Sequence, residues 1–337
     1  GKVHLRHAMA VQTKNPHLSK NGDDIYFHLG FDSDFDVRYH FGKVKFVCMG
    51  GSGEIHQFTP VKNPAAPRMR AFANLVASNL GSEFHDYSLK MGTKLCPIGK
   101  SERYSLFKVG HVLCVNHGMG KPSLSILLHE ITKLLERANA SDVTYIRLGT
   151  CGGLSVEPGT VVITDRVFDG SLEPCFRNYV LGKEVKRSTN LDAKLLADLI
   201  QCGQDAGVPA VKGSTLSCDG FYEMQGRLDG AICEFTSENK MEFLGKCQDL
   251  GVRNIEMESG YFAAFTGHLG IPAAVVCVTL LDRTQGDAIR STPAQLEEFD
   301  QRPARVVIEW IRHKVRDMAT QHHLEAQHLG DAKRRRT

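Results

Sequence analysis

Gln225 and Arg227 lie two residues apart in the glycine-flanked segment GFYEMQGRLDG (220–230), directly after Phe221 and Tyr222. A glutamine amide offers one acceptor and two donors in a plane, and a guanidinium offers a rigid fork of donors. Together these two side chains could read the edge of a flat polar heterocycle that rests on an aromatic ring. A surface turn with solvated polar side chains explains the segment equally well when it is taken alone.

Two carboxylates form a second candidate group in the segment RNIEMESGYFAAF (253–265), where Glu256 and Glu258 flank Met257. Alternate residues of an extended segment point the same way, so both carboxylates could line one wall of a pocket. Carboxylates in that position commonly accept hydrogen bonds from a cis-diol such as that of ribose. The alternative is a pair of exposed glutamates at a helix N-terminus, which the helix dipole favours.

Three apolar runs end in glycine-containing segments: MGGS (49–52), RLGTCGG (147–153) and LLDRTQGDAI (280–289). Open α/β sheets bind ligands where strands end in such loops. Two of the three place an arginine beside small residues with free backbone N–H groups, which suits an oxyanion such as phosphate. Each glycine could also simply make a turn, but three such ends together favour an anion site.

The elements that must position these residues follow an alternating pattern of apolar runs and segments of helical spacing, which is typical of an α/β protein. We predict a single-domain three-layer sandwich, with a mixed β-sheet flanked by helices on both faces. Helices are expected over residues 69–80, 122–137, 191–205, 239–250, 259–268 and 293–316.

The domain is expected to cover residues 15–316, because no linker-like tract divides it. Within it, residues 53–67 carry three prolines and a glycine, which disfavour regular structure and predict a loop insertion. Residues 1–14 are expected to be a disordered N-terminus or an added remnant. Residues 317–337 are expected to be a disordered basic tail, although the terminal KRRR run could also serve as a nuclear import signal.

Charge and composition exclude several classes of function. The net charge is +3, and removing the four charges of the terminal KRRR run leaves −1, so a basic nucleic-acid-binding surface is not expected. No apolar run approaches the roughly 20 residues that span a bilayer, and no secretory signal is visible. The ten cysteines are scattered and none forms a C-x-x-C pair, which favours a reducing, cytoplasmic compartment.

Several familiar motifs fail. GMGKPS (118–123) is not a phosphate-binding P-loop, and neither a dinucleotide-binding fingerprint nor a G-x-S-x-G nucleophile elbow is present. His117 and His129 lack metal-ligand spacing, so each is expected to have a core or surface role. The sequence therefore predicts neither a metal site nor a cofactor.

Seven segments in order, VKFVCMGGS, HGMGKPS, IRLGTCGG, EPGTVVITD, FYEMQGRLDGA, GVRNIEMES and AAVVCVTLLDR, resemble the uridine phosphorylases of animals, within the nucleoside phosphorylase superfamily. The resemblance covers roughly residues 15–315. The glutamine-x-arginine segment together with Glu-Met-Glu is typical of the pyrimidine branch. Purine-handling relatives usually place an aspartate against the base.

The resemblance implies reversible phosphorolysis of uridine to uracil and ribose 1-phosphate, in pyrimidine salvage, by a homo-oligomer, expected to be a homodimer, with shared active sites. By this resemblance Gly51, Arg68, Arg147 and Thr150 bind phosphate. Arg103 matches an arginine that the neighbouring subunit contributes to the same phosphate. No nucleic acid or membrane partner is implied.

The remaining site residues are also carried over from the resemblance. Those expected at the base are Gly152, Phe221, Gln225, Arg227, Arg283 and Ile289. Those expected at the ribose are His28, Glu256, Met257 and Glu258, with His28 reaching the 5′-hydroxyl in a partner subunit.

The expected chemistry needs no cofactor. As the C1′–N1 bond stretches, the ribose gains positive character and the uracil ring gains negative charge. Phosphate held by Arg147 is the nucleophile and the counter-charge, while Gln225 and Arg227 stabilise the developing uracil anion. We therefore assign catalytic roles to Arg147, Arg227 and Gln225.

The sequence departs from the family pattern in four places. Met224 replaces a usual glycine, Cys151 replaces a usual serine, and Lys121 replaces an aliphatic residue. The segment between Ser52 and Arg68 is also longer than in most relatives. Two alternatives therefore stay open: a nucleosidase that uses water instead of phosphate, and a degenerate paralogue that binds a nucleoside without cleaving it.

Overall fold

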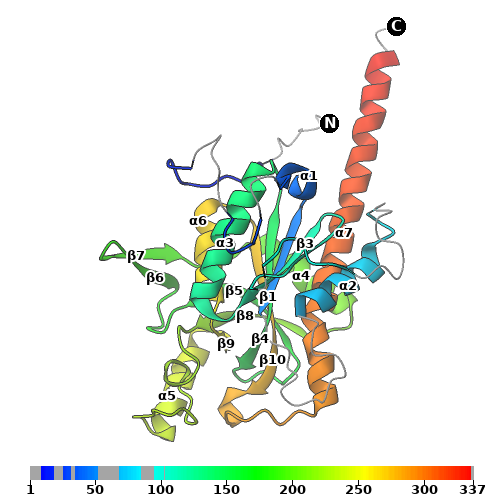
Figure 1. The fold of residues 1–337 in the computed structure, drawn as a ribbon. Coiled ribbons are helices and arrows are strands. Elements are labelled where there is room, and N and C mark those ends of the chain that lie inside the picture. The colour runs from blue at the N-terminus through cyan, green and yellow to red at the C-terminus, as the bar shows by residue number, and fades with distance from the viewer. Residues whose placement is uncertain are drawn as a thin grey trace.

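The computed structural model describes residues 9–18, 26–31, 35–51, 68–84, 95–101 and 103–334. Its centre is a mixed sheet in the order β10-β5-β8-β9-β4-β1-β3-β2, in which β10 also pairs with β4 (Figure 1). The strands of this sheet are β1 (Phe46–Gly51), β2 (Leu106–Val109), β3 (Val112–Gly118), β4 (Thr144–Gly153), β5 (Val161–Phe168), β8 (Ala210–Ser217), β9 (Val252–Glu256) and β10 (Ala273–Asp282).

Helices cover both faces of this sheet, as predicted (Figure 1). One apolar core lies under α1 (Val37–Phe41), α3 (Gly120–Arg137) and α6 (Ser259–Leu269). A second core lies under α2 (Arg68–Leu80), α4 (Ala193–Asp205) and α7 (Pro293–Arg334). The remaining helix, α5 (Ser237–Asp249), packs near β9.

The three glycine-ended strands lie together at the centre of the sheet. β1 and β10 both pair with β4, and both pairings are parallel. Parallel neighbours end at the same edge of a sheet, and strands buried on both faces are apolar throughout, as β1 and β10 are. Gly51, Gly153 and Asp282 therefore mark one edge, where the sequence predicted an anion site.

Both ends of the domain differ from the prediction. Residues 9–14, expected to be disordered, lie against the domain: Val11 is buried and its N–H donates to the carbonyl of Ala140 at 3.1 Å. Residues 1–8 lie outside the described part. α7 continues to Arg334 instead of ending near Arg316, because alanine, leucine, glutamine and lysine in this polar stretch are good helix formers.

Four other elements were not predicted: α1, β8 and the two strands of a separate hairpin, β6 (Cys175–Val180) and β7 (Lys183–Ser188). β7 reads KEVKRS and is mostly exposed, so it carries no apolar signal. The predicted loop insertion at 53–67 lies outside the described residues. Among the described residues no helix is both long and apolar enough to cross a membrane.

Candidate active site

A cavity of about 320 Å³ opens at the shared edge of β1, β4 and β10. All predicted site residues except His28 and Arg103 line it: Gly51, Arg68, Arg147, Thr150, Gly152, Phe221, Gln225, Arg227, Glu256, Met257, Glu258, Arg283 and Ile289. We call Gly51, Arg68, Arg147 and Thr150 the anion corner, and Gln225, Arg227 and Arg283 the polar wall.

The polar wall begins with a short turn that folds Gln225 and Arg227 inward. A 3-10 turn (Glu223–Gln225) ends at Gly226, whose φ of 63° lies in the left-handed region that glycine adopts most readily. Gln225 is 4% exposed and Arg227 is 8% exposed, so the reading as a solvated surface turn is wrong. The guanidinium carbon of Arg227 lies 4.4 Å from the ring centroid of Phe221, and cation–π contact holds the two together.

Arg283 is the third residue of the polar wall and contacts Gln225 twice. Its Nη2 donates to the backbone carbonyl of Gln225 at 2.7 Å, and its Nη1 donates to the amide Oε1 at 3.4 Å. The aliphatic stem of Arg283 lies directly against Gly152, where an added Cβ would approach Cγ of Arg283 to 2.9 Å. A glycine at 152 therefore leaves room for the arginine that supports the amide.

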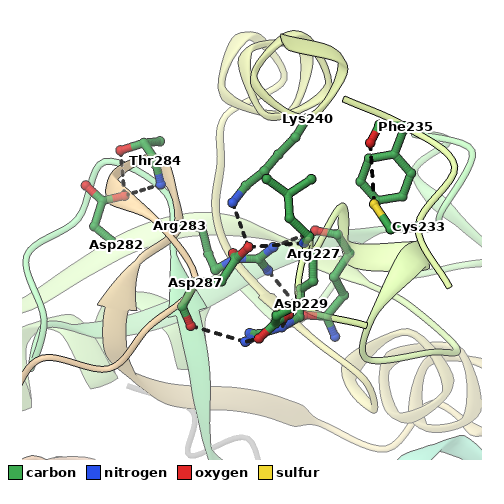
Figure 2. Close-up of polar contacts among 11 residues, drawn as sticks. Arg227, Asp229, Cys233, Phe235, Lys240, Asp282, Arg283, Thr284 and Asp287 are labelled. Atoms are coloured by element: carbon green, nitrogen blue, oxygen red, sulfur yellow. Dashed lines mark hydrogen bonds and ion pairs between the residues drawn. The ribbon is translucent and has the colours of Figure 1, made fainter. Parts of the chain in front are cut away.

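Arg227 is held by two groups. Its Nε and Nη2 donate to the two carboxylate oxygens of Asp229 at 2.9 and 2.7 Å, and Nη2 also donates to the carbonyl of Asp287 at 3.1 Å (Figure 2). Burial alone would lower the pKa of Arg227, but Asp229 and Asp287 raise it, so the guanidinium stays charged. Sequence reasoning found Arg227 and missed both aspartates.

The two glutamates of the Glu-Met-Glu segment are buried, so they are not exposed helix-end residues. Arg147 lies between them: its Nη1 is 3.0 Å from Oε2 of Glu256, and its Nη2 donates to Oε2 of Glu258. Glu256 also accepts from the backbone N–H groups of Glu258 and Ser259 at the start of α6 (2.9 and 3.0 Å). Glu258 accepts from the N–H of Gly120 at 2.6 Å.

This cluster contains one cation for two carboxylates. Burial raises the pKa of Glu256 above its ordinary value. For Glu258 the same burial effect is outweighed by the charge of Arg147 and by the hydrogen bond from the Gly120 N–H, which lower its pKa. Arg147 keeps its charge, because the neighbouring Glu256, Cys277 and Glu258 raise its pKa against the effect of burial.

His117 is a cavity residue that the sequence reasoning assigned to the core or surface. It is fully buried at the end of β3, and neither ring nitrogen has a hydrogen-bond partner within the part of the chain that the structure describes. Burial lowers its pKa to about 3, aided by Arg147 and Arg68 and opposed by Glu258, so the imidazole is neutral. The available signal was its place beside a glycine at the end of a strand. His129 does lie outside the cavity, 3.1 Å from the hydroxyl of Tyr261.

Arg68 opens α2 and completes the anion corner with Gly51 and Thr150. Its Nη2 pairs with Oδ1 of Asp300 in α7 at 2.9 Å. The chain thus places two guanidinium groups, those of Arg68 and Arg147, and backbone from two glycine-ended strands around one end of the cavity. Such a set of donors binds an oxyanion.

His28 and Arg103 do not reach this cavity within their own chain. His28 Nδ1 lies 2.5 Å from Oε1 of Glu130, which also accepts from the N–H of Leu29 through its other oxygen at 3.1 Å. Arg103 is exposed. Among the described residues no group of His, Cys, Asp and Glu side chains could hold a metal ion.

The fold and the cavity define an α/β protein in which one pocket combines donors that suit an oxyanion with an amide and a guanidinium that suit a flat polar heterocycle. A family model of the Phosphorylase superfamily matches residues 72–312. The chain is 44% identical to uridine phosphorylase 1 of Mus musculus, over 90% of this chain and 92% of that protein. The chain therefore belongs to the uridine phosphorylase family of the phosphorylase superfamily.

Solved structures agree with this family. A uridine phosphorylase of the oomycete Phytophthora capsici has a TM-score of 0.81 at 46% identity and covers 92% of this chain and 99% of its own. A Schistosoma mansoni uridine phosphorylase in complex with uracil has a TM-score of 0.79 at 38% identity, covering 89% and 98%. An inactive uridine phosphorylase B of the same organism is 37% identical over 88% of this chain and 95% of that protein.

Proposed function

We propose that this protein is a uridine phosphorylase, a pentosyltransferase that converts uridine and phosphate reversibly to uracil and ribose 1-phosphate. One observation carries the proposal: Gln225 and Arg227 line the same cavity as Arg147 and Arg68, so a base-reading wall faces an anion corner. The space between them contains Glu256 and Glu258, which suit ribose hydroxyls.

The polar wall complements uracil. The Gln225 amide can accept from an imide N–H and donate to a carbonyl oxygen, and Arg227 can donate to a second carbonyl oxygen. When the C1′–N1 bond breaks, its electron pair passes to N1 and the charge spreads to those oxygens. Donors already in place stabilise that charge without reorganising at the moment of reaction.

The anion corner supplies the nucleophile. Arg68 and Arg147, with backbone N–H groups of the glycine-ended strands, hold phosphate below the sugar, and one of its oxygens bonds to C1′ as the bond to N1 breaks. The uracil anion then takes a proton from solvent. Phosphate must share the N–H donors of Arg147 with Glu256 and Glu258. A ribose diol that donates hydrogen bonds to Glu258 would satisfy that carboxylate and leave more of these donors for the phosphate.

We further propose a homodimer in which His28 and Arg103 of one protomer complete the site of the other. Both side chains lie away from the cavity of their own chain, which supports a role across a subunit boundary. A role in pyrimidine salvage in the cytoplasm follows from the proposed reaction and the absence of disulfides among the described cysteines.

The inactive Schistosoma mansoni relative favours one alternative, a nucleoside-binding protein without turnover. A single assay separates the candidates: uridine is incubated with the protein, with and without phosphate, and products are quantified. A phosphorylase releases uracil and ribose 1-phosphate only when phosphate is present. Release of free ribose without phosphate would show a nucleosidase, and uridine binding without cleavage would show the degenerate paralogue.

A further inference from the structure

Lys240 is a buried cation outside the cavity. It lies in α5 and is 5% exposed, and its Nζ donates to Oδ2 of Asp287 at 2.8 Å (Figure 2). Lysine is rarely buried unless it is paired. Lys240 does not line the cavity, whereas Asp287, whose carbonyl accepts from Arg227, does line it.

Asp287 connects three segments. Its Oδ1 accepts from Nε of Arg283 at 2.7 Å, and its Oδ2 accepts from the N–H of Leu228 at 3.3 Å as well as from Lys240. Its backbone carbonyl accepts from Arg227 at 3.1 Å. Burial would raise the pKa of Asp287, but Lys240 and Arg283 lower it, so the carboxylate is charged at neutral pH. Helix α5, the turn at 283–287 and the turn at 225–228 therefore share one carboxylate.

Arg283 connects Asp287 to the amide of Gln225. Its Nε is fixed by Asp287, and the two remaining nitrogens donate to the backbone and side-chain oxygens of Gln225. An arginine that holds the oxygen of an amide also orients its NH₂ group. The aliphatic stem of Lys240 also packs near the turn that carries Gln225, since an added Cβ on Gly226 would lie 3.8 Å from Cγ of Lys240.

We propose that Lys240 and Asp287 are positioning residues: through Arg283 they hold Gln225, and through the Asp287 carbonyl they hold Arg227, in register with the base. The inference rests on the proposed function, because it takes the polar wall to be the base site. It assigns to a buried ion pair on α5 a part in uracil recognition and no part in phosphate binding.

The test is Lys240→Met, which keeps a long apolar stem and removes the ammonium. We expect kcat/KM for uridine to fall about 10- to 100-fold, the size of effect that a small misplacement of a binding group produces. The KM for phosphate should stay within twofold of wild type, and the affinity for uracil by calorimetry should fall. Lys240→Arg, which keeps the charge, should recover most of the uridine activity.

Lys246→Met is the matched control. Lys246 lies on the same helix and pairs with Glu242 at 2.7 Å, but both side chains are mostly exposed and neither lines the cavity. This variant should match wild type in every assay. A second test variant, Asp287→Asn, keeps the shape of the carboxylate and should reproduce the selective loss if Lys240→Met proves too unstable to purify.

Three outcomes would overturn the inference: uridine kcat/KM within threefold of wild type in Lys240→Met, an equal rise in the KM for phosphate, or the same loss in Lys246→Met. Failure of the proposed function looks different, because wild type itself would then show no phosphate-dependent cleavage. In that case the positioning role is tested by calorimetry of uracil binding to wild type and to Lys240→Met. The role is overturned if wild type does not bind uracil or if both proteins bind it with the same affinity.

Discussion

The polar wall and the anion corner face one cavity but are held in opposite ways. In the wall, Arg227 and Arg283 each pair with an aspartate close in sequence, Asp229 and Asp287. In the corner, one guanidinium, that of Arg147, serves two buried glutamates. Beside it lies the imidazole of His117, which has no hydrogen-bond partner among the described residues.

The difference indicates which end of the cavity is preformed. The donors of the wall are fixed before substrate arrives, which suits a group that stabilises charge in a transition state. At this corner Arg147 alone serves two carboxylates, so we expect its hydrogen bonds to rearrange when phosphate enters. The site therefore combines a rigid base wall with an anion corner that the ligand itself completes.

Replacing Arg147 should give the largest effect, because it should lower both the free energy of unfolding and the turnover of uridine. Arg147→Ala leaves Glu256 and Glu258 buried without a cation, and breaking a buried ion pair from one side costs about 3–5 kcal/mol. Turnover of uridine should fall by at least about 10²–10³. Urea unfolding and a steady-state assay measure the two effects, and a variant as stable as wild type would show that the carboxylates do not depend on Arg147.

Replacing Arg227 should cut activity alone. Its partner Asp229 is 52% exposed and can be solvated after the arginine is lost. Arg227→Ala should lower kcat on uridine by about 10²–10³, the usual loss for a donor to transition-state charge, with circular dichroism and melting temperature nearly unchanged. Activity within about tenfold of wild type would contradict the assignment of the base wall.

Subunit mixing tests whether the corner is completed by a partner. Arg103→Ala and Arg227→Ala protomers should each be inactive as homodimers. A mixed dimer regains one intact site. The Arg103→Ala protomer keeps its own Arg227, and its partner supplies the missing Arg103, whereas the site of the Arg227→Ala protomer lacks both arginines. Activity is measured after mixing, with subunit exchange followed by a mass-tagged chain, and exchange without recovered activity would exclude the shared site. His28→Ala in place of Arg103→Ala repeats the test at the ribose end.

The site was predictable where its residues are close together in sequence. Gln225 with Arg227 and Glu256 with Glu258 are pairs two residues apart, and the glycine strand ends follow from local patterns. Lys240 and Asp287 were missed because they are 47 residues apart and meet only in the folded chain. His117 was missed because burial without a hydrogen-bond partner cannot be read from a sequence.

The fold followed the same rule. Strands such as β1 and β10 are apolar throughout and were predicted, whereas the exposed β6–β7 hairpin has no periodic apolar face. The predicted end of the last helix near Arg316 reflected the polar composition of the sequence beyond it. Helix propensity continues past that point and extends α7 to Arg334.

His117 should make stability in the corner depend on pH. Its pKa is 6.5 in the unfolded chain and about 3 in the fold, where burial, Arg147 and Arg68 outweigh Glu258. Between these values the unfolded state binds the extra proton, so folding stability falls as pH drops below 6.5, by up to about 1.4 kcal/mol per pH unit.

The measurement compares the free energy of urea unfolding at pH 7 and pH 4.5 in wild type and in His117→Gln, without ligands. The variant should lose about 2.5 kcal/mol less than wild type over this interval. Other titrating groups are common to both proteins and cancel in the difference. Equal losses would mean that His117 is protonated in the fold near its ordinary pKa.

The smallest effect is expected from the long segment before Arg68. Resemblance to the family places phosphate contacts on both sides of it, at Gly51 and Arg68, so the position of Arg68 decides whether the corner forms. That side chain has two anchors independent of the segment: it begins α2, whose buried residues pack in the second core, and its Nη2 pairs with Asp300 at 2.9 Å.

Deleting residues 54–66 should therefore leave the KM for phosphate unchanged or slightly lower, and uridine affinity unaffected. For flexible loops in general, halving the length changes the free energy of closure by only about 0.6 kcal/mol, so we expect the fold to persist. Asp300→Ala in the same background removes the ion pair that holds Arg68 to α7 and should raise the KM for phosphate. The two variants together show whether α7 or the deleted segment positions Arg68. A folded deletion variant without phosphate-dependent cleavage would mean that residues 54–66 supply a contact of their own to the anion corner.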